Sequence, residues 1–192
     1  MAASAVRAGG DLPFSYTAPG GLIPQIGTTQ GFSNYPLFMN GTHGTPVTGV
    51  PEITSIELVL TGLTHTQPDD LDIYLISPFG ETVEVMTDKG DGIAVVNLNL
   101  IFNDLGSPLP ADGVALAAGT YDTEDATGGL SKYVGNSGGT DAWELVIIDD
   151  SDGDQGSLVS YTLRGTFIPE PASLALLGFG ALAALRRSRR TS

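Results

Sequence analysis

Apolar residues stand at every second position from Leu71 to Leu75, and Asp72 and Tyr74 lie between them. A period of two is expected of a strand with one buried face and does not fit the period of a helix. Residues 77–80, Ser-Pro-Phe-Gly, end this run. Proline removes a ladder donor and glycine accepts a positive φ, so the sequence predicts a strand followed by a tight turn. A chain with such a strand has to supply a sheet around it.

Similar segments recur along the chain, and none of them has the period of an amphipathic helix. Residues 81–87 predict a hairpin partner for the first strand, with Val83 and Val85 on one face. Residues 143–148 are almost continuously apolar, as expected of a central strand. These three segments predict the middle of a sheet.

The other candidate strands are shorter or less regular. In the segment 95–102, Val96 is expected on the same face as Leu98, Leu100 and Phe102. The remaining candidates are one or two edge strands within 11–50, a strand at 53–63, short strands near 114–116 and 119–121, and a closing strand over 156–167. With 26 glycines and 12 prolines in 192 residues, this pattern predicts an all-β sandwich of about eight or nine strands.

Two separated blocks of residues share their order and spacing with a known family. The first block runs His65-Thr66, Asp70-Leu71, Ile73, Leu75, Ser77-Pro78 and Gly80. The second block runs Trp143, Leu145, Asp149, Gly156, Leu158, Tyr161 and Leu163. Together they resemble the P domain, also called Homo B, the β-domain that follows the subtilisin-like catalytic domain of proprotein convertases. Glu81 and Tyr161 depart from that pattern, because a small hydroxyl residue and a tryptophan are usual at these positions.

The P-domain resemblance implies a jelly-roll arrangement of the sandwich. It also implies a domain that stabilises and regulates a catalytic neighbour and is not itself an enzyme. For His65 it implies a structural role, in which the ring bonds a neighbouring main-chain group or carboxylate.

The charge of the chain is negative and unevenly distributed. The net charge is −14, with 22 acidic and 8 basic residues. Half of the basic residues lie in the last seven positions, so the rest of the chain is strongly anionic. Such a field opposes binding to nucleic acid and favours divalent cations, although a merely solvated acidic surface gives the same composition.

Two acidic clusters are candidates for calcium, which prefers six to eight oxygen ligands from a flexible acidic loop. An EF-hand is not indicated, because Tyr161 stands where that loop needs its final glutamate. Aspartate–glycine runs are also ordinary turn formers, and Asp70 can cap neighbouring amides, so both interpretations stay open. The predicted ligands are Asp150, Asp152 and Asp154 in the first cluster and Asp69, Asp70 and Asp72 in the second.

The composition changes abruptly after residue 168. Pro169-Glu170-Pro171 is followed by an uncharged apolar run over 172–185, which predicts a short helix, and then by Arg186, Arg187, Arg189 and Arg190. A helix of this length rises about 21 Å, which is short of the roughly 30 Å hydrocarbon thickness of a bilayer. The arginines would snorkel and hold the C-terminus on the cytoplasmic side.

This order of tripeptide, apolar helix and arginine cluster resembles the PEP-CTERM sorting signal of Gram-negative bacteria. The resemblance implies recognition by an exosortase, insertion of residues 172–190 in the inner membrane before processing, and cleavage near the tripeptide. The product is then released to the cell envelope or extracellular matrix. An ordinary tail anchor without processing is the alternative, although an anchor has no need for Pro-Glu-Pro at its boundary.

The N-terminal segment 1–10 is small and apolar and resembles the end of an export signal, with Ala-Val-Arg-Ala as a cleavage site. We therefore expect the true start codon to lie upstream. The expected organisation is a remnant of an export signal at 1–10, a P-domain-like sandwich at 11–167 and a sorting segment at 168–192.

The catalytic alternatives are weaker than a binding or structural role. His43 lies in a segment that superficially resembles the histidine motif of subtilisins, but no stretch resembles the nucleophile segment. The absence of cysteine excludes a thiol nucleophile and a cysteine-bound zinc. The expected function is an exported, non-catalytic module that binds a protease or an extracellular polysaccharide. The alternatives are an accessory domain of a subtilisin-like serine endopeptidase, acting in trans or as a fragment of a larger protease, and a hydrolase that uses His65 with Asp70.

Overall fold

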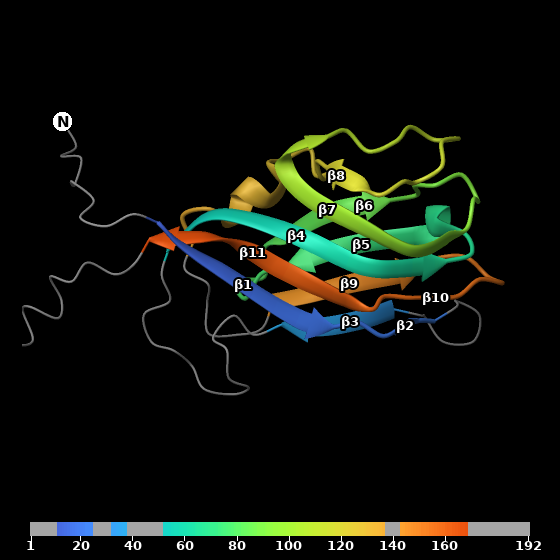
Figure 1. Ribbon diagram of the computed structural model, residues 1–192, viewed down its shortest axis with the longest axis horizontal. Coiled ribbons are helices and arrows are strands. Elements are labelled where there is room, and N and C mark those ends of the chain that lie inside the picture. The colour runs from blue at the N-terminus through green and yellow to red at the C-terminus, as the bar shows by residue number, and fades with distance from the viewer. Residues whose placement is uncertain (1–10, 25–31, 38–51, 137–142, 169–192) are drawn as a thin grey trace, which may run out of the picture.

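The computed structural model describes residues 11–24, 32–37, 52–136 and 143–168. Within these ranges eleven strands form two sheets that pack face to face (Figure 1). The predicted all-β sandwich is confirmed, with more strands than the eight or nine expected. The larger sheet contains β1 (Leu12–Pro19), β2 (Leu22–Ile23), β4 (Glu52–His65), β7 (Val95–Ser107), β8 (Gly119–Tyr121), β10 (Gly156–Ser157) and β11 (Ser160–Ile168). The smaller sheet contains β3 (Phe32–Leu37), β5 (Leu71–Ile76), β6 (Thr82–Thr87) and β9 (Trp143–Asp149).

β4 is the organising strand of the larger sheet. It pairs with β11 and β10 along one side and with β7 along the other, and at its middle Leu58 lies opposite both Leu163 and Phe102. Leu58 and Leu60 are fully buried, because alternate residues point at the smaller sheet, and Leu63 is buried three positions further on because the register with β7 shifts between Leu60 and Leu63. Two 3-10 helices, η1 (Pro68–Asp70) and η2 (Gly129–Tyr133), complete the described elements.

The predicted β5–β6 hairpin is confirmed. Leu75 pairs with Val83, and the Ser77 hydroxyl accepts hydrogen bonds from the main-chain N–H groups of Phe79 and Glu81. Gly80 adopts a φ of 79° in this turn, a conformation that favours glycine. β9 lies between β3 and β5, which is the central position that its apolar sequence predicts.

Two strand predictions need correction. Val96 is 78% exposed, and Val95 is buried in its place. Asn97 has a φ of 54° and the β4–β7 register shifts nearby, so this bulge exchanges the two faces of β7. No strand forms at residues 114–116 of the described chain; a turn ends there, with the Val114 N–H donating to the Ala111 carbonyl.

Residues 11–50 supply three strands, where one or two were expected, and all three lie at sheet edges as predicted. β1 carries Pro13 and Pro19, which cannot donate to a neighbouring strand. Proline therefore limits the pairing of this exposed edge with other chains. The predicted helix at 172–185, the segment 1–10 and His43 all lie outside the described residues.

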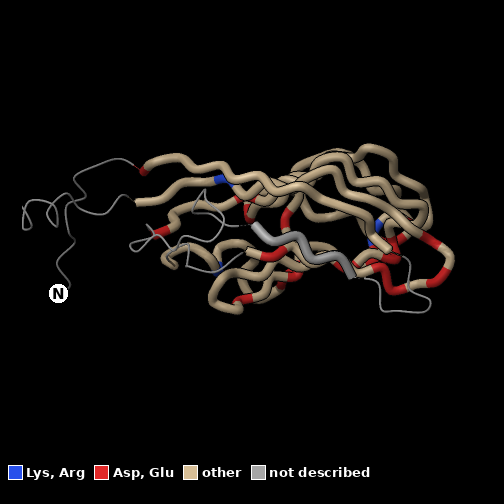
Figure 2. The backbone as a smooth tube through the Cα atoms, turned by 90° about the horizontal axis from the view of Figure 1, so that it is seen from below, with Lys and Arg blue, Asp and Glu red and all other residues tan. Residues whose placement is uncertain are grey.

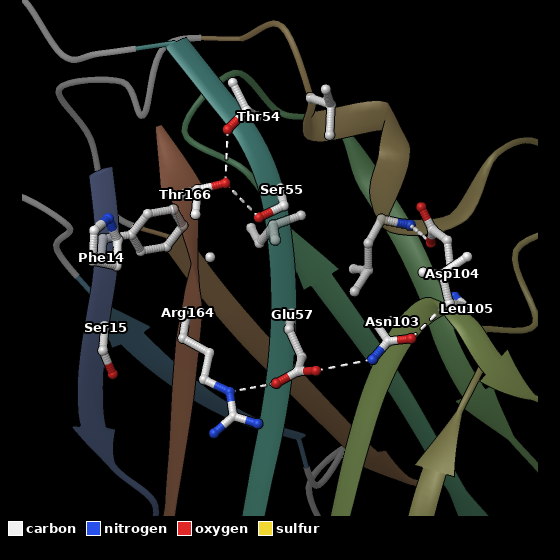
Figure 3. Close-up of a pocket in the computed structure, with 15 residues that line it drawn as sticks. Phe14, Ser15, Thr54, Ser55, Glu57, Asn103, Asp104, Leu105, Arg164 and Thr166 are labelled. Carbon is white, nitrogen blue, oxygen red and sulfur yellow. Dashed lines mark hydrogen bonds and ion pairs between the residues drawn. The ribbon is translucent and has the colours of Figure 1, made fainter. Parts of the chain in front are cut away.

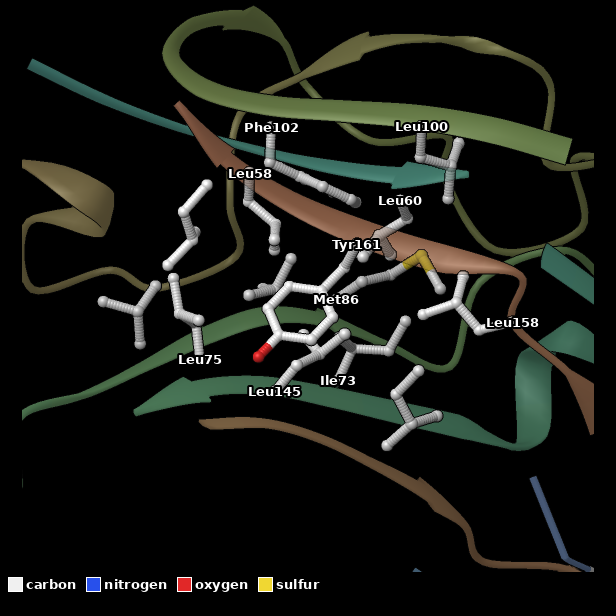
Figure 4. Packing of buried hydrophobic residues seen from close by; sticks show 14 of the residues in the cluster. Leu58, Leu60, Ile73, Leu75, Met86, Leu100, Phe102, Leu145, Leu158 and Tyr161 are labelled. Carbon is white, nitrogen blue, oxygen red and sulfur yellow. The ribbon is translucent and has the colours of Figure 1, made fainter. Parts of the chain in front are cut away.

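The core lies between the sheets and is almost entirely apolar (Figure 4). Tyr161 extends from β11 across the interface, and its hydroxyl donates to the Trp143 carbonyl at 3.4 Å. Burial raises the pKa of the Tyr161 hydroxyl well above its ordinary value. Each fully buried leucine or isoleucine contributes roughly 1.5–3 kcal/mol, so this core is sufficient to hold the sandwich without disulfides. Within the described ranges, no helix combines the length and apolar character needed to cross a bilayer.

Candidate functional site

The first candidate site is a buried polar pair that joins the two sheets. His65 ends β4 in the larger sheet and Asp149 ends β9 in the smaller one, and both side chains are 0% exposed. The His65 Nε2–H donates to Asp149 Oδ2 at 3.2 Å, and Nδ1 lies 2.8 Å from the Gln67 carbonyl oxygen. Asp149 Oδ1 accepts a second bond from the Ser151 N–H at 3.3 Å. Both ends of the imidazole are therefore engaged by the protein.

Gly156 closes this pair from β10. A Cβ at Gly156 would lie 2.3 Å from His65 Cδ2 and 2.3 Å from the Thr64 carbonyl oxygen. Only glycine allows β10 to approach β4 this closely, so the imidazole is covered by main chain and not by solvent. The geometry agrees with the structural role expected of His65, and its carboxylate partner is Asp149 and not Asp70.

The other residues of the two signature blocks lie in the core and its turns. Leu71 is fully buried at the start of β5. Trp143 is buried against Tyr133 of η2 with their rings 4.8 Å apart and nearly perpendicular. Pro78 lies in the β5–β6 turn between Ser77 and Gly80. Leu71, Trp143 and Pro78 thus contribute to packing and to the turn.

The second candidate site is an acidic corner made of Asp69, Asp70, Asp72, Asp150 and Asp154. The structure brings the two predicted calcium clusters together there, because the Gln67 amide donates to Asp70 Oδ2 at 3.1 Å and to Asp154 Oδ2 at 2.9 Å. Figure 2 shows acidic residues gathered in the loops at this end of the sandwich.

Two carboxylates of the acidic corner, those of Asp70 and Asp72, have raised pKa values. Burial is the main cause that raises the pKa of Asp70, and the charges of Asp69 and Asp154 add to it, against a hydrogen bond from Gln67. Burial also raises the pKa of Asp72, with further contributions from Asp150 and Asp88. Both carboxylates therefore hold protons more tightly than isolated aspartates do.

Neither acidic cluster forms a metal centre among the described side chains. No group of three or more histidine, cysteine, aspartate or glutamate residues is arranged there to hold a metal ion. Asp69 accepts from the Gly92 N–H at 2.8 Å, Asp154 accepts from the Thr66 hydroxyl at 2.5 Å, and Asp152 is exposed. These bonds match the capping and turn-forming alternative, and calcium binding stays a prediction.

A third feature was not anticipated from the sequence. A cavity of ≈ 590 Å³ opens over β1, β11, β4 and β7, and we call it the Arg164 groove (Figure 3). Arg164, Glu57 and Asn103 form a row across three neighbouring strands: Arg164 Nε–H donates to Glu57 Oε1, and Asn103 Nδ2–H donates to Glu57 Oε2 at 2.9 Å. The groove is lined by Pro13, Phe14, Ser15, Thr54, Ser55, Ile56, Glu57, Asn103, Asp104, Leu105, Leu130, Val134, Arg164, Gly165 and Thr166.

Period-two alternation could have identified Glu57 and Arg164 as outward-facing residues. Their cross-strand contact depends on the β4–β11 register, which the sequence does not specify. The groove could therefore be identified only from the structure.

Comparison with known proteins identifies the C-terminal segment. Residues 167–190 match the model of the PEP-CTERM protein-sorting motif. This motif implies recognition by an exosortase, a membrane-associated processing enzyme, and export to the cell envelope of Gram-negative bacteria. The match includes only the last two residues of the sandwich, so the P-domain resemblance stays a prediction. The sorting residues Pro169–Pro171 and the arginine cluster lie beyond the described part of the chain.

No curated protein matches the chain. Among solved structures, the serine protease of Aeromonas sobria in complex with its chaperone is 16% identical, with a TM-score of 0.38; the match covers 83% of this chain and 28% of that one. The same protease solved without the chaperone is also 16% identical, with a TM-score of 0.36 and coverage of 81% and 28%. This chain therefore matches less than a third of the protease structures.

Proposed function

We propose that this protein is an exported, non-catalytic binding module with a P-domain-like sandwich, which an exosortase system processes and releases to the envelope or extracellular matrix. The sorting motif directs the protein to the exosortase, and the sandwich is the mature protein that remains after processing. The sandwich then acts outside the inner membrane by binding and not by catalysis.

The observation that carries this proposal is the position of the last strand. β11 ends at Ile168, which pairs with Glu52 at the start of β4, and the sorting motif begins at residue 167. The motif thus overlaps the larger sheet only at the last two residues of β11. Cleavage at the Pro169–Pro171 tripeptide would leave every described strand in place.

The state of His65 supports a non-catalytic role. A general base needs a ring nitrogen within reach of a substrate proton. The His65 side chain is fully buried, Nε2 faces Asp149, and Nδ1 lies against the main chain of Gln67. Its partners thus match a structural link between the sheets.

The test is to follow the protein through fractions of a host that carries an exosortase. We expect wild type in the envelope or medium at a lower mass, and residues Pro169, Glu170 and Pro171 all changed to alanine to hold the protein in the inner membrane at full mass. This triple variant keeps the apolar run and the arginines, so it separates processing from anchoring.

A second arm removes residues 169–192 altogether. We expect this form to keep the melting temperature of the processed wild type and to lose processing and sorting. If the triple variant were released at the lower mass like wild type, or if the truncated chain were unfolded, the proposal would be wrong. Wild type at full mass in the inner membrane, with and without the exosortase, would instead establish an unprocessed tail anchor.

A further inference from the structure

We propose that the Arg164 groove binds an uncharged polysaccharide through the Arg164–Glu57–Asn103 row. This inference rests on the proposed function and names the ligand class of the binding module. It depends on three properties of the groove: unused hydrogen-bond donors that are held in place, an apolar surface beside them, and compensated charge.

The row has hydrogen-bonding capacity left after its internal bonds. A guanidinium carries five N–H donors, and Glu57 takes only the one on Arg164 Nε. Asn103 uses one Nδ2–H toward Glu57, while its Oδ1 accepts from the Leu105 N–H at 3.0 Å. Each carboxylate oxygen of Glu57 accepts one bond in this row and has a second lone pair. Donors and acceptors thus alternate along the row, as a ligand with many hydroxyl groups requires.

These polar groups are held before any ligand arrives. The Arg164 side chain is 48% exposed and that of Glu57 is 23% exposed, so the pair reaches solvent while its bonds fix its rotamers. At the other end of the groove, the Thr166 hydroxyl is 2.7 Å from those of Thr54 and Ser55. Preorganised polar groups lower the ordering cost of binding.

The apolar part of the groove suits the C–H faces of sugar rings. Leu105 is 97% exposed and Val134 is also exposed at the rim, and these two side chains supply the apolar surface that a ligand can reach, because Phe14, Ile56 and Leu130 are buried. Ligand sites generally combine such a surface with a few polar groups in a cavity of about 300–1,000 Å³. The ≈ 590 Å³ of this groove lies in that range.

Charge selects an uncharged ligand. Arg164 and Glu57 neutralise one another, and Asp104 Oδ1 accepts a hydrogen bond from the Leu130 N–H at 2.8 Å. With Arg164 balanced by Glu57 and the Asp104 carboxylate nearby, the groove has no net positive charge, so a polyanionic chain such as an alginate would gain no attraction there. A neutral polymer needs no such attraction and still satisfies the donors of the row.

The test is native affinity electrophoresis of the full chain in a polyoxyethylene detergent, which has no sugar headgroup. The gels contain hydroxyethylcellulose, galactomannan or dextran as neutral probes, and alginate as the anionic comparison. We expect at least one neutral polymer to retard the wild-type protein, and alginate not to do so. Free glucose, galactose or mannose should reverse the retardation, and this result does not depend on any variant.

Variants locate the binding. Arg164→Ala should weaken the apparent association constant about tenfold or more, because hydrogen bonds from a charged donor are lost. Arg164→Lys keeps the charge without the planar fork and should give an intermediate loss. Thr17→Ala is the matched control, because Thr17 of β1 pairs with Thr162 of β11, on two strands that also contribute to the groove, but does not itself line it. Its retardation should equal that of wild type.

Retardation by none of the three neutral polymers would overturn the proposal, and so would retardation that Arg164→Ala leaves unchanged in a protein with the wild-type melting temperature. Preferential retardation by alginate would overturn the charge argument and the proposal with it. Arg164→Ala should still be processed and sorted like wild type. Failure of the sugar test with normal sorting therefore leaves the sorting function in place, while mis-sorting of wild type is a separate failure.

Discussion

The buried link between the sheets makes a strong prediction for Asp149→Asn. Asp149 accepts two hydrogen bonds, from the His65 Nε2–H through Oδ2 and from the Ser151 N–H through Oδ1. An asparagine of the same shape has one acceptor oxygen and one NH₂ group. If the NH₂ faces Ser151, that N–H loses its acceptor; if it faces His65, the ring has to carry its proton on Nδ1 beside the Gln67 carbonyl, and a bond to a carboxylate is exchanged for a weaker one to a neutral amide.

The expected cost follows from the burial of the pair. A buried donor without a partner costs about 1–3 kcal/mol. In a domain of this size each kcal/mol shifts the melting temperature by about 2–4 °C, so the melting temperature should fall by roughly 2–12 °C. Differential scanning calorimetry at neutral pH measures this shift. Asp152→Asn is the matched control, because it makes the same chemical change at an exposed position of the same loop, and it should shift the melting temperature by less than about 1 °C.

Equal melting temperatures for Asp149→Asn and wild type would refute the view that this pair joins the sheets. An Asp149→Asn variant more stable than wild type would refute it more strongly. It would mean that the His65–Asp149 pair lowers the stability of the fold, which is typical of reactive sites and not of structural links. In that case His65 and Asp149 would again be candidates for chemistry.

Three further predictions test the closing strand, the charges and the ions. Gly156→Ala should destabilise the protein by about 1–3 kcal/mol in urea unfolding, because its Cβ meets His65 and the Thr64 carbonyl at 2.3 Å; an unchanged midpoint would contradict this close approach. Asp125 is partly desolvated, but its hydrogen bonds with Lys132 and Thr127 lower its pKa to about 2, so it contributes roughly 2 kcal/mol that is lost as the pH falls from about 4 to 2. Asp70 and Asp72 have raised pKa values and act in the opposite sense, so the melting temperature should rise as the pH falls from neutral toward 4. Below about pH 4 the protonation of Asp125 should lower the melting temperature, and Asp125→Asn should weaken this decrease. If calcium binds, millimolar calcium should raise the melting temperature more than magnesium or sodium does at equal ionic strength. Equal shifts with all three salts would mean that the ions only screen the charges of the acidic corner.

The sequence predicted the parts of the fold that depend on local pattern. Alternation along Leu71–Ile76 and the turn at Ser77 specify a strand and its hairpin, because the paired residues, from Ile76 and Thr82 to Asp72 and Thr87, are at most 15 positions apart. The same reasoning failed at Val96, where Asn97 adopts a positive φ and exchanges the faces of β7. A bulge of this kind depends on the neighbouring strand, and alternation alone cannot locate it.

The sites depend on contacts between distant segments, and the sequence specified them less well. The blocks that resemble a P domain marked both His65 and Asp149, but not their contact across 84 residues of chain. Arg164 and Glu57 are 107 residues apart and meet only because β11 pairs with β4 in one register. Composition had indicated acidic clusters, but not that Gln67 links Asp70 to Asp154. The sequence therefore predicts local features, whereas contacts that depend on the register between distant strands are seen only in the structure.

The length of β4 explains how an acidic domain is compatible with a membrane-directed tail. Glu52 at the start of β4 pairs with Ile168, where the sorting motif continues, and His65 at its end pairs with Gly156 beside the acidic corner. At about 3.3 Å per residue these two ends are roughly 40 Å apart. This distance is several times the screening length of about 8 Å at physiological ionic strength. An anionic bilayer at the tail end therefore barely repels the acidic corner, so this corner is compatible with a membrane or an exosortase at the other end of the sandwich.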